Sequence, residues 1–326
     1  MKLLVHIHAY NVPADRTVEA VLDQTHPADA VVVVDNAATI PILQSPVPPQ
    51  VRVVRNAKNC GPGGAVVTGL TYALDRGYEW IWILDGDSVP RKDALEKLVD
   101  LCGSFDPGMR ASLGIVSSAQ RLVPSPKLFL GRRLTPRGPR PPHIDHALLY
   151  CECDSILWSG SLVNLDAVRA VGLPRYGPQG PWHDLSFDYG DMAFAYRLRR
   201  AGYRVLVHRT SIIDHPVGQA KLMTLLNRPL VSTNHSADRR YLFFRNLVYF
   251  WTYLYQKQEW LGLTLWFSYR LTVTIIGILL LERGRTRKVA ACLKGTFDGF
   301  RRNLETQYDP SAGRALRAGP SAAGNG

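Results

Sequence analysis

The most constraining feature of the sequence is the stretch 80–87, which reads WIWILDGD. Five large apolar residues stand in a row with no polar face, which is typical of a strand buried on both sides within a parallel sheet. In open α/β sheets ligands bind at the carboxyl ends of the strands, so Asp85 and Asp87 stand where a ligand is expected. Carboxylates suit Mg²⁺ or Mn²⁺, which complete their shell with phosphate and water. The stretch predicts a metal-diphosphate site, although an isolated pair of this kind also occurs in solvated turns.

Other apolar runs with polar ends precede this stretch. Residues 3–8 and 30–34 predict buried strands, and residues 51–54 predict a third. The second run closes on Asp35, which is placed to accept hydrogen bonds from a nucleotide's base or ribose, or to serve as an ordinary turn carboxylate. Strands alternating with helices predict an α/β nucleotide-binding half over residues 1–103.

A glycine-rich turn follows the third strand. Residues 59–64 read NCGPGG and open a helix that Gly77 ends. Such a turn at a helix start can bind phosphate, but its spacing matches neither the dinucleotide fingerprint nor the P-loop. The glycine-rich turn therefore predicts that the backbone approaches a ligand closely, but it does not identify the ligand.

The following half, residues 104–220, holds further candidates. Residues 124–142 are rich in Pro, Arg and Gly and predict a mobile surface loop. An extended pattern over 147–158 ends at Trp158, which is either a core residue or a stacking platform for a sugar ring. Further on, a strand at 204–208 is followed by His215, whose ring could complete a metal site.

Two carboxylates stand three residues apart at the start of a predicted helix that ends at Gly202. Asp188 and Asp191 can point the same way there, and the helix dipole favours their ionised forms. Capping of the helix by Asp188 is the alternative, but it explains Asp191 less well.

Cysteine usage and the first residues bear on the compartment. The five cysteines are an odd number without a C-x-x-C pair, which argues against a disulfide framework or structural zinc and for a reducing compartment. Residues 1–8 are too short an apolar run for a signal peptide, so we expect the chain to start in the cytosol.

Positive charge gathers in the C-terminal part. Residues 197–326 hold 21 Lys and Arg against 7 Asp and Glu, whereas residues 1–196 hold 18 against 20. The apolar runs 241–255 and 261–281 suit an anionic membrane surface better than a nucleic-acid groove. The second run carries Arg270 near its centre, so an interfacial helix, a true span, and a helix packed on the catalytic domain or a dimer partner all stay open. We expect a helical, membrane-associated region over 221–308 and a disordered tail over 309–326.

Taken together, these residues resemble the family 2 inverting glycosyltransferases with the GT-A fold, and among them bacterial rhamnosyltransferases and initiating galactofuranosyltransferases. The matching segments are VVDN at 33–36, NCGPGGA at 59–65, LDGD at 84–87, Asp191 with Arg197, DHP at 214–216 and RRYLFFRN at 239–246. Where the family has a second acid two residues after its catalytic base, this chain has Ala193. The resemblance implies a GT-A catalytic domain over 1–220, a mostly parallel sheet flanked by helices.

The resemblance also implies a set of site residues. Asp191 is the implied catalytic base, while Asp85, Asp87 and His215 are the implied ligands of Mn²⁺ or Mg²⁺. The implied donor-binding residues are His8, Tyr10, Asp35, Asn59, Gly63, Gly64 and Asp85, and the acceptor-binding ones are Trp158 and Asp188. The implied reaction is a single displacement that inverts the anomeric carbon.

The implied function is transfer of a sugar from a nucleotide diphosphate, dTDP-rhamnose or UDP-galactofuranose in the first place. The acceptor is expected to be a lipid-linked saccharide of cell-envelope polysaccharide synthesis, met at the cytoplasmic face of the plasma membrane by a peripheral or monotopic enzyme. No nucleic-acid partner is expected, and homo-oligomerisation is left open. Two alternatives remain, a non-catalytic membrane scaffold with a degenerate nucleotide fold and a sugar-1-phosphate nucleotidyltransferase.

Overall fold

The chain forms two compact units in a computed structural model. Unit 1 holds Met1–Pro174 and Gly190–Val217, and unit 2 holds Arg175–Tyr189 and Gly218–Gly326. The residues that the structure describes are 1–123, 127–174, 188–216, 221–225, 228–255, 257–304, 306–309 and 314–317. The expected boundaries at 220 and 308 stay predictions.

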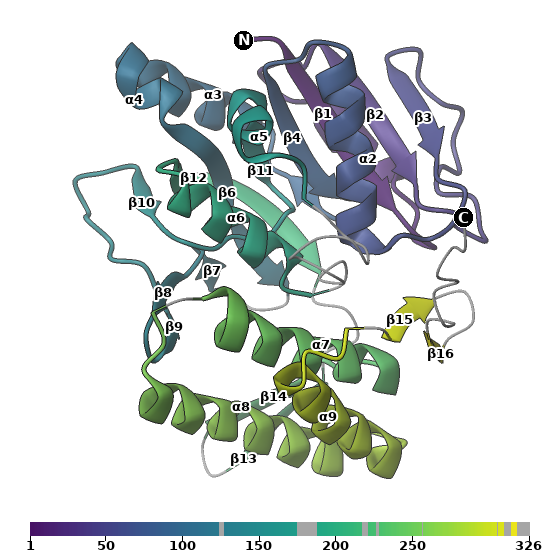
Figure 1. The fold of residues 1–326 in the computed structure, drawn as a ribbon. Helices are drawn as coiled ribbons and strands as arrows, with labels where there is room; N and C mark the ends of the chain where they lie inside the picture. The colour runs from purple at the N-terminus through teal and green to yellow at the C-terminus, as the bar shows by residue number, and fades with distance from the viewer. Residues whose placement is uncertain are drawn as a thin grey trace, which may run out of the picture. The chain divides into compact units, whose positions relative to one another are not determined.

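Unit 1 is built on a ten-stranded mixed sheet in the order β10-β12-β6-β11-β4-β1-β2-β3, with β5 beside β12 and β7 beside β6 (Figure 1). The ten strands of this sheet are β1 (Leu3–Ala9), β2 (Ala30–Asp35), β3 (Val51–Arg55), β4 (Trp80–Asp85), β5 (Val89–Pro90), β6 (Leu113–Val123), β7 (Leu128–Phe129), β10 (Tyr150–Glu152), β11 (Ser161–Asn164) and β12 (Arg204–Pro216). Unit 1 also holds β8 (Arg133–Thr135) and β9 (Gly138–Arg140), which pair with each other. Its helices are α1 (Asp15–Leu22), α2 (Gly61–Asp75), α3 (Ala94–Ser104), α4 (Pro107–Ala111), α5 (Leu165–Val171) and α6 (Gly190–Arg200).

The sheet of unit 1 is covered on both faces, as the run at residues 80–84 predicts. Along β4, Trp80, Trp82 and Leu84 belong to a core cluster with side chains of α1 and α3. Ile81 and Ile83 belong to the opposite cluster, which side chains of α2, α5 and α6 complete. These five residues are all buried, which confirms a strand enclosed on both sides.

The strands β4, β1, β2 and β3 pair in parallel, so their carboxyl ends meet at one edge. His8 stands opposite Asp85 in the pairing of β1 with β4, and Ala9 stands opposite Asp35 in the pairing of β1 with β2. The polar residues that end these strands therefore share that edge, as the sequence predicts.

Some elements differ from the sequence expectation. The extended pattern at 147–158 yields only the short strand β10, and the chain pairs again from Ser161. Within 124–142, residues 124–126 lie outside the described residues, while β7 pairs with β6 and β8 pairs with β9, so this segment carries short paired strands. The predicted strand at 204–208 continues to Pro216, because β12 pairs in parallel with β6 along its length.

Unit 2 is mainly helical. Its elements are β13 (Lys221–Leu225), β14 (Arg228–Ser232), α7 (Ala237–Tyr249), the π-helical turn η1 (Phe250–Leu254), α8 (Trp260–Leu281), α9 (Arg285–Phe300), β15 (Thr306–Asp309) and β16 (Arg314–Arg317). The strand β15 ends at Asp309, where the expected tail begins, and pairs with β16 inside that tail, while residues 310–313 and 318–326 lie outside the described residues. Among the described residues, α8 is the one helix long and apolar enough to cross a membrane.

Candidate metal and nucleotide site

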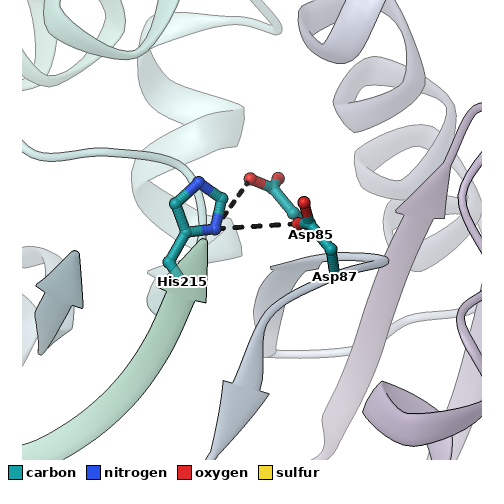
Figure 2. A group of neighbouring side chains, drawn as sticks. All are labelled: Asp85, Asp87 and His215. Carbon is teal, nitrogen blue, oxygen red and sulfur yellow. Dashed lines mark ion pairs between the residues drawn. The ribbon is translucent and has the colours of Figure 1, made fainter. Parts of the chain in front are cut away.

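Three side chains from distant parts of unit 1 form a group with the chemistry of a metal site (Figure 2). Asp85, Asp87 and His215 each offer one ligand atom, and these atoms lie within 4.8 Å of one another. His215 Nδ1 lies 3.6 Å from Asp85 Oδ2 and 3.8 Å from Asp87 Oδ1. The structure thus brings together the three residues predicted to hold a metal.

A tight turn presents the two carboxylates. After β4 the chain turns at Gly86, whose backbone N–H donates to His8 O at 2.8 Å, and Ser88 N–H donates to Asp85 O at 3.0 Å. A Cβ on Gly86 would lie 2.8 Å from the Cβ of Ala9, so a larger residue would push the turn away from β1. Glycine between the two acids is therefore required by the close approach of β1.

His215 reaches this turn through strand pairing. The strand β12 pairs with β5, where Asp214 stands opposite Val89, two residues after Asp87. The adjacent Asp214 forms an ion pair with Arg121 of β6, so its carboxylate is engaged beside the group. Pairing with both β5 and β6 fixes the end of β12 on which the histidine stands.

Two serines that sequence reasoning did not identify support the group. Ser88 Oγ lies 2.7 Å from His215 Nδ1 and accepts a hydrogen bond from Ser159 Oγ at 2.8 Å. Ser159 Oγ also accepts from the backbone N–H of Asp85 at 3.1 Å. Since Ser159 lies 74 residues from Asp85, the only available signal was its place beside Trp158 at the end of an apolar run.

His8 contacts the group from the neighbouring strand. Its Nε2 lies 2.9 Å from Asp85 Oδ1, and its ring stacks on His6 with a centroid distance of 5.4 Å. Burial alone would raise the pKa of Asp85, but His8, followed by His215 and His6, lowers that pKa to about 2. Asp85 is therefore a carboxylate across the neutral pH range.

The three ligand atoms of this group suit a divalent cation. Burial raises the pKa of Asp87, and the nearby charge of Asp85 raises it further, so the pair repels itself when both are ionised. A cation between the carboxylates would remove this repulsion, and two oxygens with one imidazole nitrogen are ligands that Mg²⁺ and Mn²⁺ accept. The acidic and histidine cluster supports use of a divalent metal without identifying it.

The polar end of β2 lies along the same edge. Asp35 is buried, accepts from the N–H of Ala38 at 2.8 Å and forms an ion pair with Arg55. Next to it, Asn36 Nδ2 donates to Asn59 Oδ1 at 2.9 Å. This arrangement ties the end of β2 to the glycine-rich turn.

Asn59 and two glycines shape the start of α2. Asn59 Oδ1 accepts from the N–H of Gly61 at 2.8 Å, which holds the entry to the helix. A Cβ on Gly64 would clash with the Cβ of Cys60, whereas Gly63 is buried in the first helical turn. The side chain of the N-cap residue Cys60 accepts no hydrogen bond from this turn and Pro62 has no N–H, so the N–H groups of Gly63 and Gly64 are the ones suited to a phosphate.

The remaining predicted residues lie in different surroundings. Tyr10 is half-buried against the core cluster on the α1 side. Trp158 is buried on the other side of the sheet, 5.4 Å from the ring of Phe194, so the structure places it in the core, and a contact with acceptor stays a prediction.

The two acids near residue 190 belong to different units. Asp191 stands in the first turn of α6, where its Oδ1 accepts from the N–H of Met192 at 2.7 Å. Asp188 is in unit 2, with Oδ1 3.6 Å from Arg239, and burial raises its pKa. The metal group includes neither of them, which agrees with their predicted roles outside the metal shell but does not test those roles.

Comparison with known proteins supports the resemblance. Residues 5–107, about a third of the chain, match the sequence model described as Glycosyl transferase family 2. The chain is 38% identical over 100 residues to the succinoglycan biosynthesis protein ExoO of Rhizobium meliloti, covering 29% of this chain and 28% of that protein. It is 25% identical over 283 residues to the galactofuranosyltransferase GlfT1 of Mycolicibacterium smegmatis, covering 78% of this chain and 89% of that protein.

A solved structure shares the fold. The crystal structure of GalNAc-T7 with UDP, GalNAc and Mn²⁺ matches with a TM-score of 0.52 and 13% identity, over 66% of this chain and 43% of that one. At this identity the likeness shows the fold alone. Together with the family match it confirms the predicted GT-A fold.

Proposed function

We propose that this chain is a metal-dependent inverting glycosyltransferase that moves a sugar from a nucleotide diphosphate to a lipid-linked saccharide acceptor in cell-envelope glycan synthesis. The observation that carries the proposal is the group of Asp85, Asp87 and His215 at the carboxyl edge of a sheet, with both carboxylates inside the segment 5–107 that matches the family 2 model. A degenerate scaffold would have no need to keep three metal-binding side chains converged from positions 130 residues apart.

In the proposed reaction each residue has one task. Asp85, Asp87 and His215 would hold Mn²⁺ or Mg²⁺, which when bound supplies positive charge to the leaving diphosphate. Asp35 and Asn59, with the uncapped start of α2 at Gly63 and Gly64, orient the nucleotide. Asp191 takes the proton of the acceptor hydroxyl that attacks the anomeric carbon. The sugar–phosphate bond breaks as the new glycosidic bond forms, with inversion.

UDP-galactofuranose is the favoured donor, followed by dTDP-rhamnose. The match to a named galactofuranosyltransferase over 89% of that protein's length supports the first sugar. The relative named for succinoglycan biosynthesis supports a role in polysaccharide assembly. The basic, apolar second half of the chain supports an acceptor that resides in the membrane, met at its cytoplasmic face.

The test is a donor panel on purified protein. UDP-galactofuranose, dTDP-rhamnose, UDP-glucose, UDP-galactose and UDP-N-acetylglucosamine are each scored by thermal shift and hydrolysis, with Mn²⁺, Mg²⁺ or chelator. We expect one donor to stabilise the protein and to be hydrolysed only with metal. A protein that neither binds nor hydrolyses any donor would leave the non-catalytic scaffold as the better reading.

An Asp87→Ala variant sharpens the test. It should lose the metal-dependent stabilisation by UDP or dTDP, because one carboxylate of the group is gone. The matched control is Asp166→Asn, which changes a carboxylate that is 80% exposed and pairs with Arg169. Equal thermal shifts in Asp87→Ala and the parent would contradict the metal assignment.

A further inference from the structure

Helix α8 exposes an apolar stripe along its length. Leu261, Leu265 and Tyr269 follow one another at four-residue spacing and are 74%, 64% and 65% exposed. Ile276, Leu279 and Leu280 continue the stripe on the same side of the helix. With 22 residues the helix is about 33 Å long. The stripe is therefore a contiguous exposed apolar patch, unlike the single exposed apolar side chains that are normal on protein surfaces.

The opposite side of α8 packs inside unit 2. Ile278 belongs to an apolar cluster with Phe244 of α7 and Cys292 of α9, and Leu271 packs against the same cluster. Leu263 and Gly277 are also buried. The helix therefore has a protein-facing side and an outward side.

Helix α9 packs on α7 and exposes apolar side chains of its own. Its small residues face α7, where a Cβ on Gly299 would lie 2.6 Å from Arg245 O and one on Gly295 would clash with Tyr241 O. This tight packing fixes the rotation of α9, which leaves Leu293, Phe297 and Phe300 exposed. Figure 1 shows α7, α8 and α9 as neighbouring helices.

We propose that this docking face binds an anionic lipid bilayer, with α8 lying in the plane of the membrane. The docking face comprises Leu261, Leu265, Tyr269, Ile276, Leu279 and Leu280, all on α8. Helix α8 is apolar on both sides and buries one of them inside unit 2, so its outward apolar side and the basic residues beyond its end together form a surface suited to the headgroup boundary. The proposal deepens the proposed function, because it says how the transferase would reach a membrane acceptor.

The charged residues near the docking face favour anionic lipid as its partner. Three arginines are exposed just after α8: Arg283 in the link, and Arg285 and Arg287 in the first turn of α9. The acids nearby are already engaged, since Glu282 is fully buried with Arg240 and Lys288, and Asp298 is buried against Lys294. Anionic headgroups attract these arginines, whereas the docking face of a second copy would offer them no carboxylate.

The packing of α8 argues against a spanning helix. A bilayer around α8 would also enclose the parts of α7 and α9 packed on it, and these carry Arg240, Lys288 and Asp298. Arg270 lies near the middle of α8, with its guanidinium 5.9 Å from the ring of Phe243. Charged groups at the bilayer centre are disfavoured. With α8 lying on the bilayer surface, the apolar stripe contacts lipid while the charged residues stay outside the hydrocarbon core.

The test uses the full chain and vesicles without any sugar. Flotation with phosphatidylglycerol-containing vesicles is compared with flotation on phosphatidylcholine alone. We expect Leu261→Ser/Leu265→Ser to bind anionic vesicles at least tenfold more weakly than the parent. The matched control, Leu148→Ser/Leu149→Ser, changes two exposed leucines of unit 1 and should bind as the parent does. Unchanged melting temperatures verify folding.

Orientation is read by labelling the two ends of α8. In a Cys60→Ser background the other native cysteines are buried, so Glu259→Cys and Arg283→Cys report each end separately. On preformed anionic vesicles both ends should react with a membrane-impermeant maleimide. Protection of one end would mean a spanning helix and would overturn the proposal. So would a parent that ignores vesicles but forms a dimer that the leucine variant dissolves. Neither result depends on donor hydrolysis, so failure here is distinguishable from failure of the proposed function.

Discussion

His8 Nε2 lies 2.9 Å from Asp85 Oδ1, and the two residues stand opposite each other in the pairing of β1 with β4. The resemblance gave His8 to the donor, but the structure directs its ring to the carboxylate predicted to bind metal. A histidine in that place fixes the rotation of the carboxylate, as outer partners of metal ligands commonly do. We therefore propose that His8 positions Asp85, and its contact with the donor stays a prediction.

Removing the His8 ring should weaken Mn²⁺ binding. We expect His8→Ala to lower Mn²⁺ affinity about 10- to 100-fold in the presence of UDP, since outer partners of ligands contribute that much. His8→Gln, whose amide can donate in place of Nε2, should recover part of the loss. Free Mn²⁺ measured by electron paramagnetic resonance gives the affinity directly. The exposed His146→Ala is the control, and parental affinity in His8→Ala would refute the positioning role.

Gly69 makes room for the buried ring of His6. A Cβ at position 69 would clash with that ring, whose pKa is held well below the usual range by burial and then by His8. Gly69→Ala should thus destabilise the protein by about 1–3 kcal/mol, the usual cost of overpacking.

The effect of Gly69→Ala on stability should change sign once the His6 ring is removed. In a His6→Ala background the clash is absent, and Gly69→Ala should then stabilise by about 0.5–1 kcal/mol through helix propensity. Urea unfolding of the four proteins measures the coupling. An equal cost of Gly69→Ala in both backgrounds would show that the clash with His6 is not its cause.

The fold and the metal group follow from local patterns to different degrees. The strand ending at Asp85 and the start of α2 at Gly61 were predictable, because burial on both sides and helix initiation leave local signatures. The pairing of β12 with β6 was not, because it joins residues about 90 apart and no periodicity encodes a partner. His215 was a candidate ligand because it follows a predicted strand, and the resemblance of its segment to a known motif joined it to Asp85 and Asp87.

Residues without chemical motifs were the hardest to anticipate. Ser88 and Ser159 support the metal group, yet serines in turns are common and nothing local separates these two. Lys288 lies in the basic flank after the second apolar run, yet it is 14% exposed and paired with the buried Glu282, because the turn after α8 folds that carboxylate inward. Nothing in the sequence separates it from the exposed arginines beside it.

Protonation of His208 should cost stability in mild acid. The ring is buried and its Nδ1 accepts from the N–H groups of Thr210 and Ser211, while burial, then Lys97, lowers its pKa to about 4. The unfolded chain binds the proton near pH 6.5, so stability falls as pH drops from 6.5 toward 4 and is unaffected above 6.5.

The variant His208→Asn keeps an acceptor for those N–H groups but cannot titrate. Between pH 7.5 and 5.5 the parent should lose about 1.4 kcal/mol more unfolding free energy than this variant. Urea melts at the two pH values give the difference. The control His146→Asn, at an exposed site, should follow the parent. Identical losses in the parent and His208→Asn would exclude His208 as the titrating group.

Asp191 is the proposed general base, and its removal should separate binding from transfer. Asp191→Asn keeps an oxygen to accept from the N–H of Met192, so the start of α6 should persist. We expect transfer to fall by about 10² to 10⁴, with metal-dependent donor binding unchanged. Single-turnover transfer and donor thermal shift are the two measurements. Near-parental transfer would move the base elsewhere, with Asp188 as the next candidate.

The arginines after α8 should control binding to anionic vesicles, whereas Lys288 should control folding. Reversal of Arg283, Arg285 and Arg287 to Glu changes exposed side chains, of which Arg287 is 72% exposed and 3.9 Å from Asp238, so little stability should be lost. Each basic side chain near an anionic leaflet contributes about 1 kcal/mol, so the triple reversal should weaken vesicle binding more than 100-fold at low salt.

Lys288→Glu would instead place a second negative charge beside the buried Glu282, and we expect about 3–5 kcal/mol of destabilisation. High salt should weaken parental binding without abolishing it, because the apolar docking face is not screened. Flotation at two salt concentrations, with urea melts of each variant, measures both effects. Vesicle binding by the triple variant at parental strength would show that the apolar face acts without the arginines.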